Sequence, residues 1–276
     1  MFRGGLAIAA IGLVWTMSPA PGDRAYPAAH RGEHSAYRRG PRVTIDLGHW
    51  NGSPGDARLL GLADLLTWDG YQVTRSRQHL VPELLEDARV LVVAGPLSFP
   101  PILRPAAAAM GWADRPAFGP DEAAAVRDWV LGGGGLLLAA NTAGSAAASA
   151  PLAAAFGLAF HECPADRYFA QATLGEHPLL AGIHPEYEAV QFAAATAHGW
   201  VAAWPAGGGP AVPVLLAPAA AGFCAAGKPL AAALEFGRGR VVALAAQLER
   251  PQSAVGRPGN RQLTLNIFHW LSRAGN

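Results

Sequence analysis

Residues 132–144 read GGGGLLLAANTAG, and this stretch places a short apolar segment between a run of glycines and a sharp polar turn. Small residues that can open a helix follow the turn, so the layout is that of a buried strand leading into a nucleophile elbow. Enzymes with such an elbow carry Ser or Cys at the turn, whereas this chain has Asn141. An amide nitrogen has no free lone pair for attack on a carbonyl. We therefore expect an elbow retained for its geometry, with Asn141 in a strained backbone conformation.

On the N-terminal side of this stretch, apolar strands alternate with amphipathic helices. A strand at 43–47 (VTIDL), a helix at 57–68 and a strand at 71–75 form one βαβ unit. The pattern continues with a short helix at 82–87, a strand at 90–94 (VLVVA), a helix at 120–131 and a strand at 135–140. Continuous apolar strands separated by helices are typical of a parallel sheet that is covered on both faces.

The C-terminal part is richer in strands. Strands are predicted at 190–194, 212–217, 230–236 and 240–246, and the sequence GRGR between the last two predicts a hairpin turn. Residues 260–273 (NRQLTLNIFHWLSR) form an amphipathic helix that closes the chain. The predicted fold class is α/β, an open and mostly parallel flavodoxin-like sheet with helices on both faces.

The N-terminus has the pattern of an export signal. Arg3 precedes an uncharged segment whose apolar centre, residues 6–15, is shorter than a typical membrane-spanning helix. Small residues at 18–20 suit a signal peptidase, but Pro21 disfavours cleavage, so an uncleaved anchor remains the alternative. We expect a signal peptide or anchor at 1–20, a flexible tether at 21–41 and one folded domain at 42–274, exported to the periplasm or the extracellular space.

Composition excludes several classes of partner. The 276 residues are 51% hydrophobic and 15% charged, which is enough for a substantial core. With a net charge of +1 and Lys228 as the only lysine, the chain has no basic face for nucleic acid. The glycine run precedes its strand and lacks the Lys and Ser/Thr of a phosphate-binding loop, so neither a nucleotide nor any other cofactor is expected.

Several short sequence segments within residues 42–273 together carry a resemblance to a known family. They are IDLGHWN, GLADLLTWDGYQV, ARVLVVAGP, FGPDEAAAVRDWVLGGGGLLLAAN, APLAAAFGLAF, EHPLLAGI, LEFGRGRVVAL and NRQLTLNIFHWLS. In this order the chain resembles a poorly characterised bacterial family whose domain is similar to class I glutamine amidotransferases and related to domains of gliding-motility and intraflagellar-transport proteins. The resemblance implies the amidotransferase-like fold, but it does not imply a reaction.

True glutamine amidotransferases carry a Cys at the elbow and a His with an acid further along. Asn141 stands at the matching turn, while Cys163 (in FHECP) and Cys224 (in AGFCAAG) lie elsewhere. The nearer relatives often end this strand with Asp-His, so Asn141-Thr142 departs from their pattern too. We expect no glutaminase activity, and a structural or disulfide role for the two cysteines, whose spacing alone does not show whether they pair.

Polar residues gather where the predicted strands end. Ligands in open parallel sheets bind beyond the carboxyl ends of the strands, where the loops face a common crevice. The predicted ligand-binding residues are Asp46, His49, Asn51, Asn141, Thr142, Gln247 and Glu249. Gly95 and Ser98 follow a fourth strand. Each has a structural alternative: Asp46 caps its loop, His49 bonds to backbone, and Asn141 holds the turn. If the crevice is real, the side chain of Asn141 should be solvated and point towards Asp46 and His49.

Metal ligand types are present, but no spacing organises them. Candidates are Asp46, His49, His161, Glu162, Cys163, His177, His184 and His198. Without an HExxH or CxxC motif, no metal site is predicted. Trp129 and Trp270 are expected in the core, whereas Trp50, Trp112, Trp200 and Trp204 lie in loops where they could stack on a sugar or a partner.

These observations favour a binding protein over an enzyme. The leading interpretation is a non-catalytic binding or assembly module of the cell envelope, with a small polar ligand (a saccharide among the candidates) or a protein partner at the strand ends. The alternative is a hydrolase that uses Asp46, His49 and Glu249, with or without a metal.

Overall fold

The computed structural model describes residues 40–51, 57–112, 114–163, 169–171, 173–183, 191–193, 199–203, 210–217, 226–246 and 258–272. The predicted signal segment and nearly all of the tether lie outside this part of the chain, as do Gln247, Glu249, Cys224 and Trp204. The first strand begins at Arg42. Among the described helices, none combines the length and the apolar character needed to cross a membrane.

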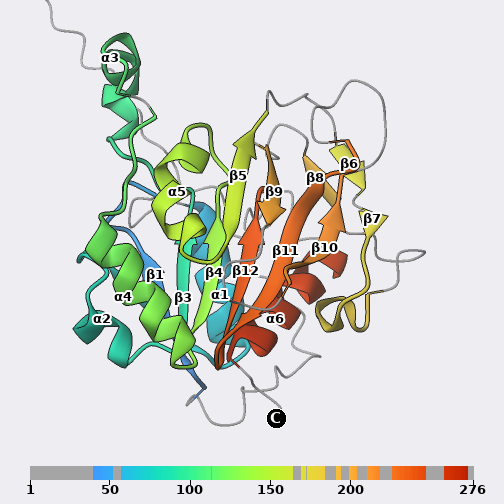
Figure 1. Cartoon of the computed structure of the whole chain (residues 1–276). Helices are drawn as coiled ribbons and strands as arrows, with labels where there is room; N and C mark the ends of the chain where they lie inside the picture. Colours follow the sequence, from blue (N-terminus) through green and yellow to red (C-terminus); the bar gives the residue numbers. More distant parts are fainter. Residues whose placement is uncertain are drawn as a thin grey trace, which may run out of the picture.

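The core of the molecule is a twisted sheet of eight described strands in the order β2-β1-β3-β4-β12-β11-β10-β7 (Figure 1). The five strands from β2 to β12 pair in parallel, and β11, β10 and β7 continue the sheet antiparallel. Their bounds are β1 Arg42–Asp46, β2 Gln72–Ser76, β3 Val90–Ala94, β4 Gly135–Ala139, β7 Thr173–Leu174, β10 Val212–Leu216, β11 Pro229–Phe236 and β12 Gly239–Leu244. The predicted fold class is confirmed.

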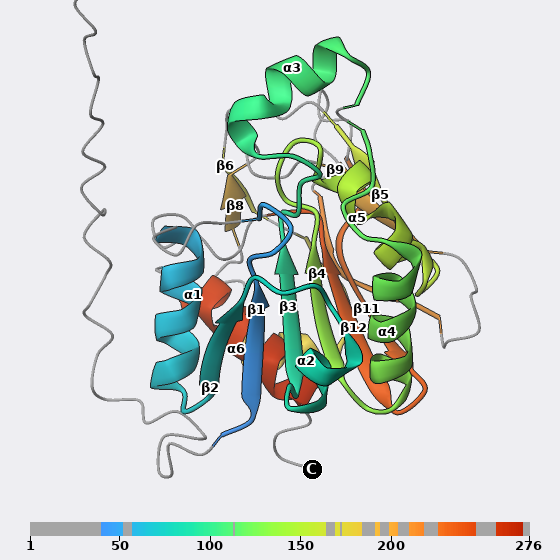
Figure 2. The same cartoon turned by 90° about the vertical axis from the view of Figure 1, so that its left-hand side faces the viewer.

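Helices cover both faces of the sheet (Figure 2). On one face lie α1 (Ala57–Trp68) and α6 (Pro258–Ser272), and on the other lie α2 (Pro82–Glu86), α4 (Pro120–Leu131) and α5 (Ser145–Ala154). Successive strand residues point to opposite faces, so Val92 packs in a cluster with Leu62 and Phe268, whereas Leu91 packs with Val126. This double burial explains why VLVVA and GLLLA are apolar without alternation.

The glycine run turns the chain from α4 into β4 through a crowded space. Gly133 has φ +123°, a backbone conformation that residues other than glycine rarely adopt. A Cβ at Gly135 would lie 2.5 Å from the carbonyl oxygen of Leu271 in α6. The glycines therefore release the chain from the helix, as predicted, and also let α6 pack against the start of β4.

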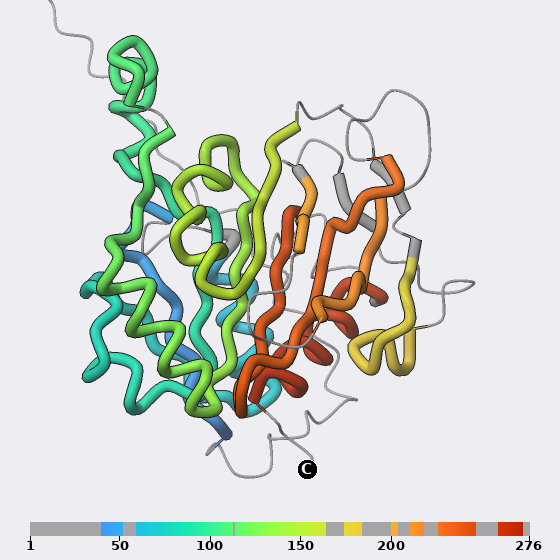
Figure 3. The backbone as a smooth tube through the Cα atoms, viewed as in Figure 1, coloured from blue at the N-terminus to red at the C-terminus, as the bar shows by residue number. Residues whose placement is uncertain are grey.

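The antiparallel half returns the chain to the centre of the sheet. Figure 3 shows the early strands on one side and the late strands on the other, with β12 beside β4 although about a hundred residues separate them. The predicted GRGR turn joins β11 and β12 as an antiparallel pair. The predicted strand at 190–194 corresponds to β8 (Gln191–Ala193), which pairs with β6 (Phe169–Gln171) in a separate small sheet.

Further elements were not predicted. Strands β5 (Leu158–Glu162) and β9 (Gly199–Ala203) form a second small sheet. The turns η1 (Pro101–Leu103) and η2 (Pro178–Leu180) and the short helix α3 (Arg104–Ala109) complete the described elements. Helix α3 stands beyond the carboxyl ends of the parallel strands, at the top of Figures 1 and 2.

Candidate functional site

The site lies at a topological switch point of the sheet. From β1 the chain passes through α1 to β2 on one side, and β3 then pairs with β1 on the other side. The loops after β1 and β3 thus leave in opposite directions, and such a switch point is the usual ligand position in open α/β sheets. The backbone N–H of Leu97, after β3, donates to the carbonyl of His49, after β1, at 2.8 Å and ties the two loops together.

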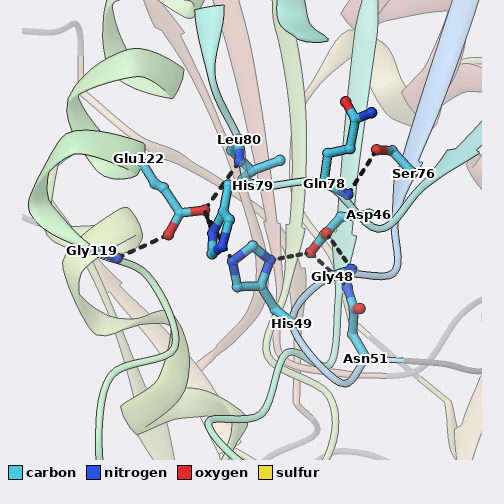
Figure 4. A network of polar contacts seen from close by, with 10 residues as sticks. All are labelled: Asp46, Gly48, His49, Asn51, Ser76, Gln78, His79, Leu80, Gly119 and Glu122. Carbon is cyan, nitrogen blue, oxygen red and sulfur yellow. Dashed lines mark hydrogen bonds and ion pairs between the residues drawn. The ribbon is translucent and has the colours of Figure 1, made fainter.

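Asp46, the last residue of β1, folds the loop that follows it around its own carboxylate (Figure 4). The side chain is 1% exposed. Its Oδ1 accepts the backbone N–H of Gly48 at 2.9 Å, and its Oδ2 accepts Nδ2 of Asn51 at 2.9 Å and faces Nδ1 of His49 at 2.8 Å. The carboxylate caps the loop, as the structural alternative predicted, and it also brings Asp46, His49 and Asn51 together.

Trp50 shows how tightly this loop is wound. It has φ 52° and is, among the described residues, the one non-glycine with a positive φ. That conformation is costly for a bulky side chain and is found mostly where a functional site requires it. The reversal buries His49 and Asn51 on either side and leaves the indole of Trp50 52% exposed. The strain predicted at Asn141 therefore lies at Trp50 instead.

Two residues that the sequence did not single out complete the site. Oε1 of Glu122, in the first turn of α4, faces Nε2 of His49 at 3.2 Å and Nδ1 of His79 at 3.1 Å (Figure 4). The same oxygen accepts the backbone N–H of Leu80 at 3.0 Å, and Oε2 accepts that of Gly119 at 3.1 Å. Glu122 is thus fixed by two backbone donors and presents its charge to both histidines.

The electrostatics favour a cation between Asp46 and Glu122. Burial alone would lower the pKa of His49, but the hydrogen bond and charge of Asp46, with those of Glu122, outweigh it and raise that pKa. Burial would raise the pKa of Glu122, but the N–H groups of Gly119 and Leu80, the charge of His49 and the hydrogen bond with His79 lower it. Glu122 is therefore an anion held for pairing and not a base poised near neutral pH.

Asn141 and Thr142 lie at the end of β4, against the neighbouring strand end. A Cβ on Gly95, after β3, would lie 2.9 Å from Oδ1 of Asn141 and 3.1 Å from Oγ1 of Thr142. Asn141 is 1% exposed, so the prediction that its side chain is solvated is wrong: the backbone of β3 packs directly over it. The role of these two residues in ligand binding stays a prediction, and Gln247 and Glu249 lie outside the described residues.

Two buried oxygens at these strand ends stand out. Oδ1 of Asn51 and Oγ1 of Thr142 accept or donate no hydrogen bond within the described part of the chain. Buried polar atoms in proteins are nearly always satisfied by protein, water or ligand. Each of these two predicted site residues therefore has a buried polar atom without a hydrogen-bond partner among the described residues.

The cysteines and tryptophans mostly follow the sequence predictions. Cys163 is buried directly after β5 and is disulfide-bonded, which confirms its structural role. Trp129 and Trp270 pack half-buried against the core. Trp112, near the end of α3, is 38% exposed, whereas Trp200 lies in strand β9, not in a loop, and its ring stacks on His161.

Comparison with known proteins adds information on the fold. No protein-family model matches the chain, and no curated protein matches its sequence. Among solved structures, the N-terminal domain of mmIFT52 aligns with a TM-score of 0.62 at 13% identity, over 85% of this chain and 99% of that one. The chain has an amidotransferase-like α/β fold.

Two further solved structures agree with this assignment. A ThuA-like protein from Bacteroides uniformis aligns with a TM-score of 0.52 at 13% identity, over 90% of this chain and 95% of that one. A cytoplasmic protein from Salmonella typhimurium aligns with a TM-score of 0.52 at 15% identity, over 84% and 99% of the two chains. Likeness at this level of identity establishes the fold alone.

Proposed function

We propose that this protein is a non-catalytic binding module of the cell envelope, which holds a small polar ligand at the switch point between β1 and β3. The observation that carries the proposal is the line Asp46–His49–Glu122, in which a nearly buried imidazole bridges two carboxylates fixed by backbone N–H groups. Ligand sites typically contain a few polar side chains that are already held in place, as these three are, beside an apolar core. The envelope location rests on the N-terminal export pattern.

Several features argue against amide hydrolysis at this site. Asn141 occupies the elbow and Cys163 is in a disulfide, so neither supplies a thiolate. The carboxylates already accept two or three hydrogen bonds each, and the pKa of Glu122 is lowered, which makes it a weak base. General base catalysis works best with a pKa near the operating pH.

A saccharide is the ligand class that suits the surroundings. Trp50 is exposed and directly follows His49 in the sequence, and the exposed ring of His79 contacts the same Glu122 oxygen as His49. Sugars combine apolar ring faces, which stack on aromatic side chains, with hydroxyl groups that hydrogen-bond to carboxylates and amides.

A hydrolase remains the second candidate because His49, His79 and Glu122 could hold a metal ion. In that case the ion would supply an activated water, and Asp46 would orient the ligand His49 from behind. Glu249, the further carboxylate of this alternative, lies outside the described residues. The two functions differ in what happens to the substrate, so turnover separates them.

The test is a binding screen with soluble oligosaccharides, namely N-acetylglucosamine trimer, maltotriose and cellotriose, followed by calorimetry. We expect one of them to quench tryptophan fluorescence and Trp50→Ala to weaken its binding at least about tenfold, the loss of one aromatic contact of roughly 1.4 kcal/mol. Trp112→Ala is the matched control, because Trp112 is also exposed but follows helix α3 and not strand β1. Absence of binding to all three sugars, or equal loss in both variants, would contradict the proposal. Turnover that disappears in His49→Gln would favour the hydrolase.

A further inference from the structure

We propose that His49, His79 and Glu122 form a binding site for a zinc-like divalent transition-metal ion. One ligand atom from each of the three residues lies within 4.8 Å of the other two. The site was not predicted from the sequence, because its ligands come from the loop after β1, the loop before α2 and the first turn of α4. This inference rests on the binding function proposed above, and it identifies the group at the centre of that site.

Two of the three ligand separations match those of a tetrahedral site, and the third is within 4.8 Å. Zinc lies about 2.0–2.2 Å from imidazole nitrogen and carboxylate oxygen, so two ligands of one tetrahedral ion are about 3.3 Å apart. Oε1 of Glu122 lies 3.2 Å from Nε2 of His49 and 3.1 Å from Nδ1 of His79. An ion can therefore enter with small movements, most of them in His79, whose side chain is 85% exposed.

The residues behind the ligands have the arrangement that metal sites require. When His49 is neutral with its proton on Nδ1, it donates that proton to Oδ2 of Asp46, and the lone pair of Nε2 is directed at Glu122. A carboxylate behind a histidine in this way fixes the tautomer and raises the basicity of the ligand. Glu122 is held in turn by the backbone N–H groups of Leu80 and Gly119. Two of the three ligands are thus oriented before any ion arrives.

Charge balance points the same way. If His49 is neutral, its Nε2 lone pair faces an anionic oxygen of Glu122, and this contact needs a cation between the two atoms. Either a proton or a metal ion can fill that role. The carboxylates of Asp46 and Glu122 lie on the two sides of the His49 ring, and the ion would contact the oxygen of Glu122 directly.

The donor set selects the class of ion. Two imidazoles and one carboxylate suit zinc and its neighbours in the first transition row, whereas calcium and magnesium prefer oxygen ligands throughout. Three protein ligands leave a fourth position for water or for an oxygen of the bound ligand, as in His₂Glu zinc sites. The metal would then be the contact through which a sugar hydroxyl or carboxylate is held.

The experiment is a calorimetric titration of the untagged, chelator-treated full chain with zinc chloride, repeated with Co²⁺ to record the visible absorption of a tetrahedral ion. We expect one zinc ion per chain, and at least about tenfold weaker binding in His79→Ala and in Glu122→Gln. His79→Ala is the decisive variant, because the exposed ring can be removed without disturbing the core. His161→Ala is the matched control, since His161 is an exposed histidine next to a carboxylate and should leave zinc affinity unchanged.

Absence of zinc binding in the wild-type chain, or wild-type affinity in His79→Ala, would overturn the inference and leave a proton as the cation between His49 and Glu122. Equal weakening in His161→Ala would also overturn it, because it would indicate general surface binding. The two proposals fail separately. Zinc binding without sugar binding would support the metal site and contradict the proposed function, whereas unchanged sugar affinity in the chelator-treated chain would support the function without the metal.

Discussion

Replacing Asp46 by Asn is expected to destabilise the folded protein by about 3–5 kcal/mol, the range found when one partner of a buried charged pair is removed. Asp46 is buried, and its carboxylate faces three nitrogens, those of Gly48, His49 and Asn51. An Asn side chain has one oxygen, so its amide group must face at least one of these donors. One lost bond to a charged acceptor costs about 1.5–3 kcal/mol. The rest of the effect comes from His49, which loses the anion beside its Nδ1.

Urea unfolding followed by circular dichroism measures this difference, and a fall in melting temperature of about 6–20 °C should accompany it. Asp64→Asn is the matched control, because Asp64 is exposed on α1 and its change should cost less than about 0.5 kcal/mol. A loss below about 1 kcal/mol in Asp46→Asn would refute the reasoning. It would mean that the loop after β1 is held by other contacts and that the charge of Asp46 matters little.

Two further predictions concern stability. Gly135→Ala should destabilise the folded protein by about 1–3 kcal/mol in the same urea assay, because the new Cβ would lie 2.5 Å from the carbonyl oxygen of Leu271. Gly132→Ala is the control and should be close to neutral, because Gly132 has φ −72° and its Cβ would have a nearest contact of 3.3 Å. Burial lowers the pKa of His177 from 6.5, and its Nδ1 accepts the N–H of Leu179, so the folded state prefers neutral His177. As pH falls, the histidine is protonated in the unfolded chain first, so the free energy of unfolding should decrease slightly below pH 6.5. His177→Asn keeps a side chain that can accept the N–H of Leu179, and it should remove this pH dependence.

The sheet and its helices could be predicted because parallel strands that are buried on both faces have continuous apolar sequences. Four elements were predicted with bounds within two residues of those observed. The signals were the apolar runs of β3 and β4, the helical spacing in α1 and the proline at the start of α4. Helix α3 and strands β5 and β9 were not predicted. The alanine-rich sequence of α3 and the five-residue sequences of β5 and β9 have no clear periodicity, and the two strands depend on pairing with each other across about 40 residues.

The candidate site could be predicted only where its residues are close in sequence. Asp46, His49 and Asn51 lie within six positions, so the end of β1 identified them together. His49 and Glu122 are separated by 73 positions, and no spacing rule connects them. The one available signal was Gly119-x-x-Glu122 at the start of α4, a capping-box spacing that explains a glutamate there without a functional role. His79 carried no signal at all.

The one positive φ among the described non-glycine residues lies in a different loop from the one that the sequence suggested. The elbow after β4 was expected to hold the strained residue, yet the positive φ lies at Trp50, and Asn141 is packed under the backbone that follows β3. The groups that reach solvent are instead Trp50 and His79, on the loops after β1 and before α2. A molecule that approaches the switch point therefore meets the first loop and the start of α4 before it can meet the elbow. The linked polar side chains Asp46, His49 and Glu122 lie at the end of β1 and the start of α4, whereas the position of the amidotransferase nucleophile, after β4, holds the buried Asn141.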